Sequence, residues 1–188
     1  MSCSRTIPRV AIGLLLLMAA GAFAQKASPK PVLTPEQSCR AYVQKFYGWY
    51  VPAMLHSGNK VMSDVALDRK DFAFSPELRK SLKEDLAASR KNKDEIVGLD
   101  FDPFLNTQDP EHRYVVGTVT VKDAHCSANV HGVVSGKKNE KSDVTPELEL
   151  RDGRWTFINF HYGQTEKPED ENLLAVLKTL RDARKTSR

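Results

Sequence analysis

The chain has 188 residues, with 28 lysines and arginines against 24 aspartates and glutamates, and a formal net charge of +4. This length suits one ordinary domain that buries a core, rather than a chain of several domains. The basic residues form no run interleaved with aromatic residues, so the sequence predicts no nucleic-acid partner.

Residues 1–24 have the pattern of a secretory signal peptide. Two arginines form a positive n-region, an apolar run follows over residues 10–20, and Ala22 and Ala24 are the small residues that a signal peptidase reads. The sequence therefore predicts cleavage before Gln25. The apolar run is about half as long as a membrane-spanning helix, and no cysteine stands at the cleavage site. We therefore expect a soluble periplasmic or secreted protein, without a transmembrane anchor after cleavage.

Removal of this segment changes the charge and the cysteine count. It takes away two arginines and no acidic residue, so 26 basic residues remain against 24 acidic ones and the net charge falls to about +2. Cys3 leaves with the signal peptide, whereas Cys39 and Cys126 remain. Two cysteines in an oxidising compartment usually pair, so we predict a disulfide between them; two buried free thiols are the alternative.

After a flexible leader at residues 25–33, the sequence predicts a single α+β domain over residues 34–188. Its first helix has Thr34 as N-cap, a proline at the first helical position and Gln37 where a capping box requires it. An apolar stripe at helical spacing follows: Cys39, Tyr42, Val43, Phe46 and Tyr50. Pro52 is expected to end or kink this helix, because proline has no N–H to donate and its ring crowds the preceding turn.

Two further helices and four strands are expected downstream. Ser75 caps a helix that opens with a proline, and a last helix runs over roughly residues 170–184. Between them the apolar period changes to two, which predicts strands over residues 114–121, 128–134, 144–150 and 154–162. Asp152-Gly153 is a tight hairpin signal. Pro146 places the third strand at an edge, because proline cannot donate to a central ladder.

Helices followed by antiparallel strands indicate an α+β fold, in which N-terminal helices pack on one face of a curved antiparallel sheet of about four strands and a C-terminal helix follows.

Four short segments carry a resemblance to a known family: Phe46-Tyr47 with Trp49-Tyr50, Phe74-Ser75-Pro76-Glu77-Leu78, Asp102-Pro103-Phe104, and Gly153-Arg154-Trp155. Together they resemble the YbjP-like family of bacterial envelope proteins, a domain of unknown function, over roughly residues 38–180. The resemblance implies the cone fold of nuclear-transport-factor-like proteins, in which a helix-backed curved sheet encloses a pocket. It implies no established activity, and this chain lacks the lipidation cysteine of some family members.

Strict alternation along the last predicted strand puts four residues on one face: Trp155, Phe157, Asn159 and His161. In a cone, this face lines the pocket, with Asn159 and His161 as polar contacts and His131 joining them from a neighbouring strand. The alternative is that His161 is simply a hydrogen-bonded histidine near the end of a strand.

Other chemistry has less support in the sequence. No Cys-x-x-Cys or His-x-x-x-His pair is present, and the aspartates around residue 102 lack the spacing of a calcium loop, so we predict no metal and no cofactor. Asp102 is expected to cap a turn, with Phe104 and Leu105 buried below it. Trp49 lies off the apolar stripe of the first helix, and it either packs under another helix or anchors an interface.

The leading hypothesis is a non-enzymatic binding or accessory module that uses an apolar pocket or a protein-interaction surface, because no nucleophile elbow or similar catalytic signature is present. Its partner would be an envelope protein or a small apolar ligand. The alternative is a small cone-fold enzyme with His161 as general acid/base. Such an enzyme requires His161 to lie in a cavity, within hydrogen-bond reach of an aspartate or glutamate.

Overall fold

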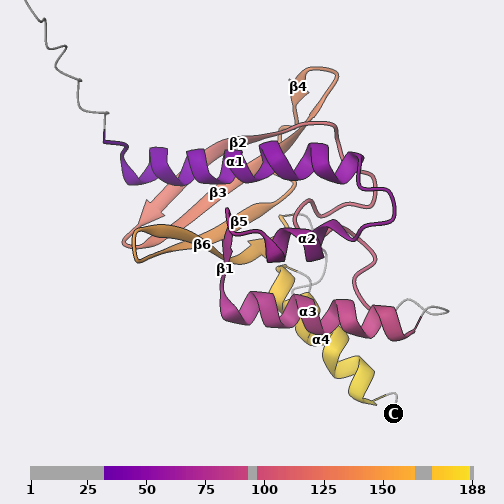
Figure 1. The fold of residues 1–188 in the computed structure, drawn as a ribbon. Coiled ribbons are helices and arrows are strands. Elements are labelled where there is room, and N and C mark those ends of the chain that lie inside the picture. The colour runs from indigo at the N-terminus through magenta and orange to yellow at the C-terminus, as the bar shows by residue number, and fades with distance from the viewer. Residues whose placement is uncertain (1–31, 93–96, 164–170, 187–188) are drawn as a thin grey trace, which may run out of the picture. The chain divides into compact units, whose positions relative to one another are not determined.

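The computed structural model describes residues 32–92, 97–163 and 171–186. The predicted signal peptide and most of the predicted leader lie outside these ranges. From Leu33 onward the chain forms one compact unit, and its described part contains four helices and six strands (Figure 1). In chain order they are α1 (Pro35–Leu55), α2 (Met62–Asp68), β1 (Ala73–Phe74), α3 (Pro76–Lys91), β2 (Tyr114–Lys122), β3 (His125–Val134), β4 (Lys137–Lys138), β5 (Thr145–Arg151), β6 (Arg154–His161) and α4 (Leu173–Thr186).

The strands form one open sheet in the order β1-β6-β5-β3-β2, and β4 pairs with β3 beside this path. β1 runs parallel to β6 and the other pairs are antiparallel, so the sheet is mixed. The four predicted strands correspond to β2, β3, β5 and β6. The expectation of about four strands is too low, because β1 and β4 have two residues each and so short a segment shows no periodicity.

The third predicted strand, β5, is not at an edge of the sheet but lies between β3 and β6. Its pairing with β3 ends at Ser127 and Glu147 and resumes at an isolated bridge between Val130 and Val144. Pro146 falls inside this interruption of the ladder. An interior strand therefore tolerates the proline, because its missing N–H faces no ladder partner on β3.

α1 begins as predicted and ends later than predicted. The Thr34 hydroxyl accepts a hydrogen bond from the Gln37 N–H at 3.2 Å, and the Gln37 side chain accepts one from the Thr34 N–H at 3.0 Å, which completes the capping box. Pro52 does not end the helix, which continues to Leu55. The proline removes the helical partner of the Gly48 carbonyl, but both residues are exposed and water can reach that carbonyl.

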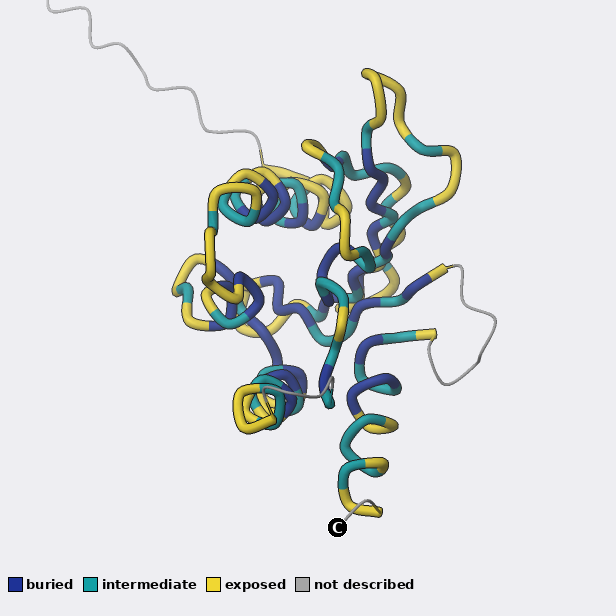
Figure 2. The backbone as a smooth tube through the Cα atoms, turned by 90° about the vertical axis from the view of Figure 1, so that its right-hand side faces the viewer, coloured by how far each residue is buried: buried dark blue, intermediate teal, exposed yellow. Residues whose placement is uncertain are grey.

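A disulfide ties α1 to the sheet. Cys39 of α1 and Cys126 of β3 are bonded, with their Cα atoms 6.7 Å apart, which confirms the predicted pair. Ser38, the residue before Cys39, adds a second link: its Oγ atom accepts a hydrogen bond from Trp155 Nε1 on β6 at 3.0 Å. Figure 2 shows that the buried residues of α1 lie on the side of the helix that faces the strands. The helix is therefore fixed across the sheet by a covalent bond as well as by packing.

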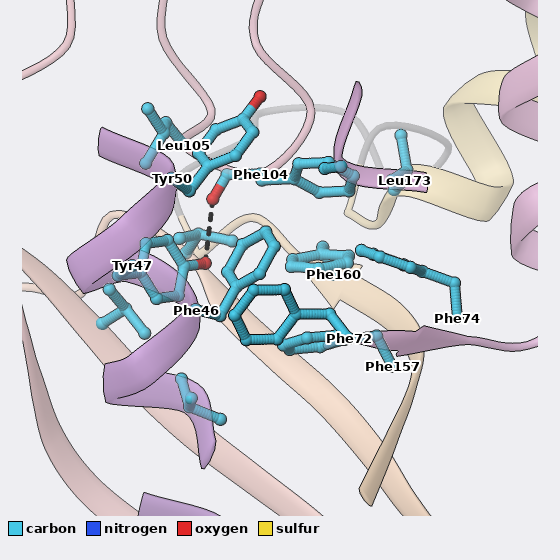
Figure 3. Packing of buried hydrophobic residues seen from close by; sticks show 14 of the residues in the cluster. Phe46, Tyr47, Tyr50, Phe72, Phe74, Phe104, Leu105, Phe157, Phe160 and Leu173 are labelled. Atoms are coloured by element: carbon cyan, nitrogen blue, oxygen red, sulfur yellow. Dashed lines mark hydrogen bonds between the residues drawn. The ribbon is translucent and has the colours of Figure 1, made fainter. Parts of the chain in front are cut away.

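Aromatic rings fill the space between α1 and the sheet (Figure 3). The ring of Phe46 on α1 lies 4.9 Å from that of Phe157, 5.1 Å from Phe72 and 5.5 Å from Phe104. Phe160 extends the cluster, with its ring 4.8 Å from Phe104 and 5.3 Å from Phe157. One core thus joins α1, β6, the segment before β1 and the loop that precedes β2.

α3 and α4 pack beside β6 and contact each other, whereas α2 contacts α1 and α3. α3 begins as predicted, with the Ser75 hydroxyl accepting from the Leu78 N–H at 3.2 Å. α4 overlaps the predicted last helix. α2 is a helix that the sequence did not predict, because seven residues make less than two full turns and show no clear period. Lys83 of α3 forms an ion pair with Asp64 of α2 at 2.5 Å and joins these two helices.

Candidate functional site

A β-bulge in β6 rearranges the residues that were predicted to line a pocket. Phe157 and Asn159 lie opposite consecutive residues of β5, so Ile158 is an extra residue in the ladder. The extra residue shifts the side-chain alternation by one, and the prediction of strict alternation along this strand is therefore wrong. Phe157 and Phe160 are both fully buried in the core, with their rings stacked 5.3 Å apart.

The bulge divides the predicted lining residues into two groups. Trp155 and Phe157 belong to the aromatic core, with 4% and 0% of their surface exposed. Asn159 and His161, beyond the bulge, are partly exposed. The structure thus places the two apolar members of the set in the packed interior and the two polar members within reach of solvent.

His161 lies beside a carboxylate. Its Nε2 atom is 2.9 Å from Glu147 Oε2 on the neighbouring strand β5. The two side chains are 43% and 32% exposed, so an ion pair between them contributes little to folding stability. The arrangement does satisfy one requirement of acid–base chemistry, since a histidine and a carboxylate lie within hydrogen-bond distance and solvent reaches both.

Asn159 anchors the beginning of α4. Its Nδ2 atom donates to Asn172 Oδ1 at 3.0 Å, and its Oδ1 atom accepts from the Leu174 N–H at 3.2 Å. Asn172 Oδ1 also accepts from the Ala175 N–H at 3.0 Å, which is the contact of a helix N-cap. Asn159 therefore positions a helix, a role that the strand pattern alone does not reveal.

His131 lies at the base of the hairpin that β3 and β4 form. Its buried ring places Nδ1 2.9 Å from the Asn139 carbonyl oxygen and 3.1 Å from the Lys141 carbonyl oxygen. Carbonyl oxygens only accept hydrogen bonds, so Nδ1 carries the proton. On the other side of the ring, a Cβ at position 117 would lie 2.5 Å from Nε2, which explains the glycine there. These contacts make His131 a support for the chain that returns from the hairpin.

The turn predicted at Asp102 forms. It also buries the Asp102 carboxylate among hydrogen-bond donors, which the sequence did not reveal. Asp102 Oδ1 accepts from the N–H groups of Phe104 at 2.9 Å and Leu105 at 3.1 Å, and both of these residues are fully buried, as expected. Oδ2 accepts from the Tyr50 hydroxyl at 2.5 Å. Burial outweighs these hydrogen bonds and raises the pKa of Asp102 to about 6.

Two more tyrosines hold the same turn. Tyr47 donates its hydroxyl proton to the Phe104 carbonyl at 2.9 Å (Figure 3), and Tyr162 donates to the Pro103 carbonyl at 2.9 Å. Burial, followed by the nearby charge of Asp102, raises the pKa of both tyrosines well above the usual value. Both hydroxyls therefore remain protonated donors, and the turn is clamped between α1 and the end of β6.

Trp49 packs within its own chain. Its ring stacks on that of Phe72 at 5.5 Å, and the guanidinium of Arg69 lies 4.3 Å from the ring centroid. The segment that follows α2 therefore contacts this ring directly, while Trp49 remains partly exposed. A role for Trp49 as an interface anchor stays a prediction.

Among residues 32–92, 97–163 and 171–186, no group of three or more His, Cys, Asp or Glu side chains is placed to hold a metal ion. In the same ranges, none of the helices combines the length and the apolar composition that crossing a bilayer requires.

Neither a protein-family model nor a curated protein matches this chain. The resemblance to the YbjP-like family therefore stays a prediction. What the fold establishes is an α+β domain, with helices packed on an open, mixed sheet and a disulfide between Cys39 and Cys126.

Proposed function

We propose that this chain is an exported, non-enzymatic accessory module of the cell envelope that binds a protein partner through its surface. The observation that carries the proposal is the aromatic filling between α1 and the sheet, where a cone-type fold of the predicted family would hold its ligand. Where the described residues between α1 and the sheet are packed in this way, recognition falls to the outer surface.

The packing of the core supports recognition through the outer surface rather than ligand binding in an interior pocket. Phe46, Phe157 and Phe160 are all fully buried. The rings of Phe46 and Phe160 both contact the ring of Phe104. The ring of Phe157 contacts the rings of Phe46 and Phe160. An apolar ligand of ring size would have to displace at least one of these side chains. Inserting extra volume into a packed core costs about 1–3 kcal/mol or more, so ligand entry would need compensating contacts.

The disulfide supports the exported part of the proposal. Structural disulfides persist in oxidising compartments such as the periplasm and are rare in the cytosol. Both sulfur-bearing residues are buried, at 0% and 1% exposed, which suits a permanent cross-link that reductants reach only with difficulty.

The test combines two measurements on protein exported from cells that express the full chain. Native mass spectrometry reports any retained small molecule, and a photo-reactive amino acid at exposed Ser127 on β3 reports a contacting protein. A matched probe at exposed Glu36 on α1 is the control. We expect no retained apolar molecule and a protein adduct that depends on the probe position. A stoichiometric apolar molecule in the purified protein would overturn the proposal in favour of an interior pocket.

A second candidate function is favoured by one observation, the 2.9 Å contact between His161 Nε2 and Glu147 Oε2. In this alternative, His161 acts as general acid/base and Glu147 orients its ring. The check is to incubate wild type and His161→Gln with envelope extracts and compare the products by mass spectrometry. A product that wild type forms and the variant does not would support an enzyme. Identical product profiles would exclude a catalytic role for His161 in those extracts.

A further inference from the structure

We infer that the basic hairpin, defined here as residues 133–141 of β3, β4 and the following loop, docks on an anionic lipid surface. Figure 1 shows the β4 hairpin extending beyond the other strands, and Figure 2 shows its tip exposed. Val133 pairs with Lys138 and Val134 pairs with Lys137 around a two-residue turn. This inference goes beyond the proposed function and does not depend on a protein partner.

The basic hairpin concentrates positive charge. Lys137, Lys138 and Lys141 are exposed, and Glu140 is the one acidic residue in this segment, so three positive charges against one negative give a net +2. Within the described part of the chain, none of the three lysines forms an ion pair that would neutralise it. At the base, exposed Arg113 adds a positive charge, and its carbonyl accepts from the Val133 N–H at 2.9 Å. Glu111 and Asp143 lie beside Gly132 and add two negative charges there, so the excess of positive charge lies toward the tip. The ammonium groups of these three lysines can therefore pair with lipid phosphate groups.

An apolar side chain lies among these cations. Val134 is 45% exposed and stands directly opposite Lys137, and opposed residues of an antiparallel pair share a face. The turn between them is formed by Ser135 and Gly136, with φ values of 48° and 80°, the left-handed pair that a tight hairpin turn requires. A valine beside a lysine at a projecting tip can enter the headgroup layer while the ammonium group stays at the phosphates.

The base of the basic hairpin is fixed by hydrogen bonds. Asp143 Oδ2 accepts from the Gly132 N–H at 2.7 Å, and Asp143 Oδ1 accepts from Asn139 Nδ2 at 3.2 Å. His131 adds its two contacts to the returning backbone. The base is therefore ordered before the tip meets a surface, and docking requires little further ordering of the strands that carry the tip.

The size of the tip favours a lipid surface over a protein. A stable protein interface buries about 800 Å² on each partner and draws on about 20–30 residues a side. The basic hairpin offers nine residues (133–141) on a two-stranded ribbon. A lipid surface requires only phosphate groups within reach of the lysines, and each lysine near an anionic surface raises affinity by about fivefold.

The experiment sediments the protein, purified from cells that express the full chain, with vesicles of phosphatidylethanolamine and phosphatidylglycerol, and with vesicles of phosphatidylcholine alone. We expect binding to the anionic vesicles only, and weaker binding as salt is raised, because ions screen exposed charges. The double variant Lys137→Gln/Lys138→Gln should bind about 25-fold more weakly, at about fivefold for each lysine.

The matched control is Lys178→Gln/Lys185→Gln on α4, which removes the same charge from two exposed lysines that both pair with Asp182. We expect this variant to bind like wild type. Val134→Ser should weaken binding as well, whereas Leu150→Ser, at another exposed apolar residue (39%), should not. Unchanged thermal midpoints for all four variants would show that they remain folded.

Three results would overturn the inference. The first is wild-type protein that does not sediment with anionic vesicles. The second is an equal loss of binding in the hairpin and α4 double variants, which would mean attraction by net charge alone. The third is a protein adduct that disappears in Lys137→Gln/Lys138→Gln while vesicle binding is absent, which would make the basic hairpin a protein-binding element.

Discussion

Asp102 brings a charge into a region of aromatic rings. Its ordinary pKa is 3.8 and burial raises it to about 6, so between about pH 4 and 6 the folded chain binds a proton that the unfolded chain does not. Acidification through this window therefore favours the folded state. This contribution to the free energy of unfolding is lost as the pH rises through the pKa of Asp102 in the folded state, about 6.

Asp102→Asn should remove this pH dependence. The asparagine can still accept from the N–H groups of Phe104 and Leu105, and its amide can donate to the Tyr50 oxygen. We expect the unfolding free energy of wild type, relative to the variant, to rise by up to about 3 kcal/mol between about pH 7.5 and pH 4. Urea unfolding at both pH values measures this difference. Parallel pH profiles would show that the carboxylate is not perturbed by its surroundings.

Two glycines provide a matched pair of predictions of opposite sign. A Cβ at position 117 would lie 2.5 Å from His131 Nε2, whereas a Cβ at Gly48 meets nothing within 4 Å. Gly117→Ala should destabilise the fold by about 1–3 kcal/mol. Gly48→Ala, on the exposed side of α1, should stabilise it by about 0.5–1 kcal/mol through helix propensity. Thermal unfolding of both variants checks the pair, and a neutral Gly117→Ala would contradict the buried position of the His131 ring.

At the scale of the elements, the disulfide holds α1 on the sheet across a sequence separation of 87 residues. Cys39→Ala/Cys126→Ala should lower the unfolding free energy by about 2–5 kcal/mol, because the unfolded chain is no longer constrained. The measurement is urea unfolding of the variant and of wild type with and without reductant. Alkylation of two thiols in freshly isolated wild type would contradict the disulfide itself.

The long elements could be predicted from the sequence because their signals are local. A capping box at Thr34 and a cap at Ser75 before a proline predict two helices, and leucines at helical spacing predict the last helix. Runs of period two predict the four long strands. None of these signals needs tertiary information. The bulge at Ile158 could not be predicted, because both faces of β6 carry apolar residues and a shift by one leaves the pattern unchanged. Asn159 and Asp102 likewise acquire their partners only from distant segments of the chain.

At the scale of the molecule, one buried ion pair fastens the C-terminal helix. Arg184 Nη1 of α4 lies 2.6 Å from Asp85 Oδ1 of α3 and also donates to the Val97 carbonyl at 2.7 Å. The Asp85 side chain is 3% exposed, so loss of its partner would leave a buried charge unpaired. Replacing Arg184 therefore removes the partner of a buried carboxylate, which costs more than the loss of a contact on the surface.

Arg184→Met should destabilise the fold by about 3–5 kcal/mol. Lys178→Met, which removes an exposed partner of Asp182 on the same helix, should cost less than about 1 kcal/mol. Chemical unfolding of the two variants gives the comparison. Equal effects would mean that the position of α4 does not depend on the buried pair.

The contacts of α1 have a consequence for the timing of folding. This helix is the first part of the domain to be synthesised, yet its bonding partners lie 57, 76, 87 and 117 positions further along the chain. A chain that emerges from its N-terminal end cannot close its core until β6 has followed, and Cys39 waits as a free thiol until Cys126 arrives. Contacts this distant in sequence slow folding. The topology thus keeps the chain open until almost all of it is available, which is compatible with the proposed export of this chain through a narrow channel before it folds.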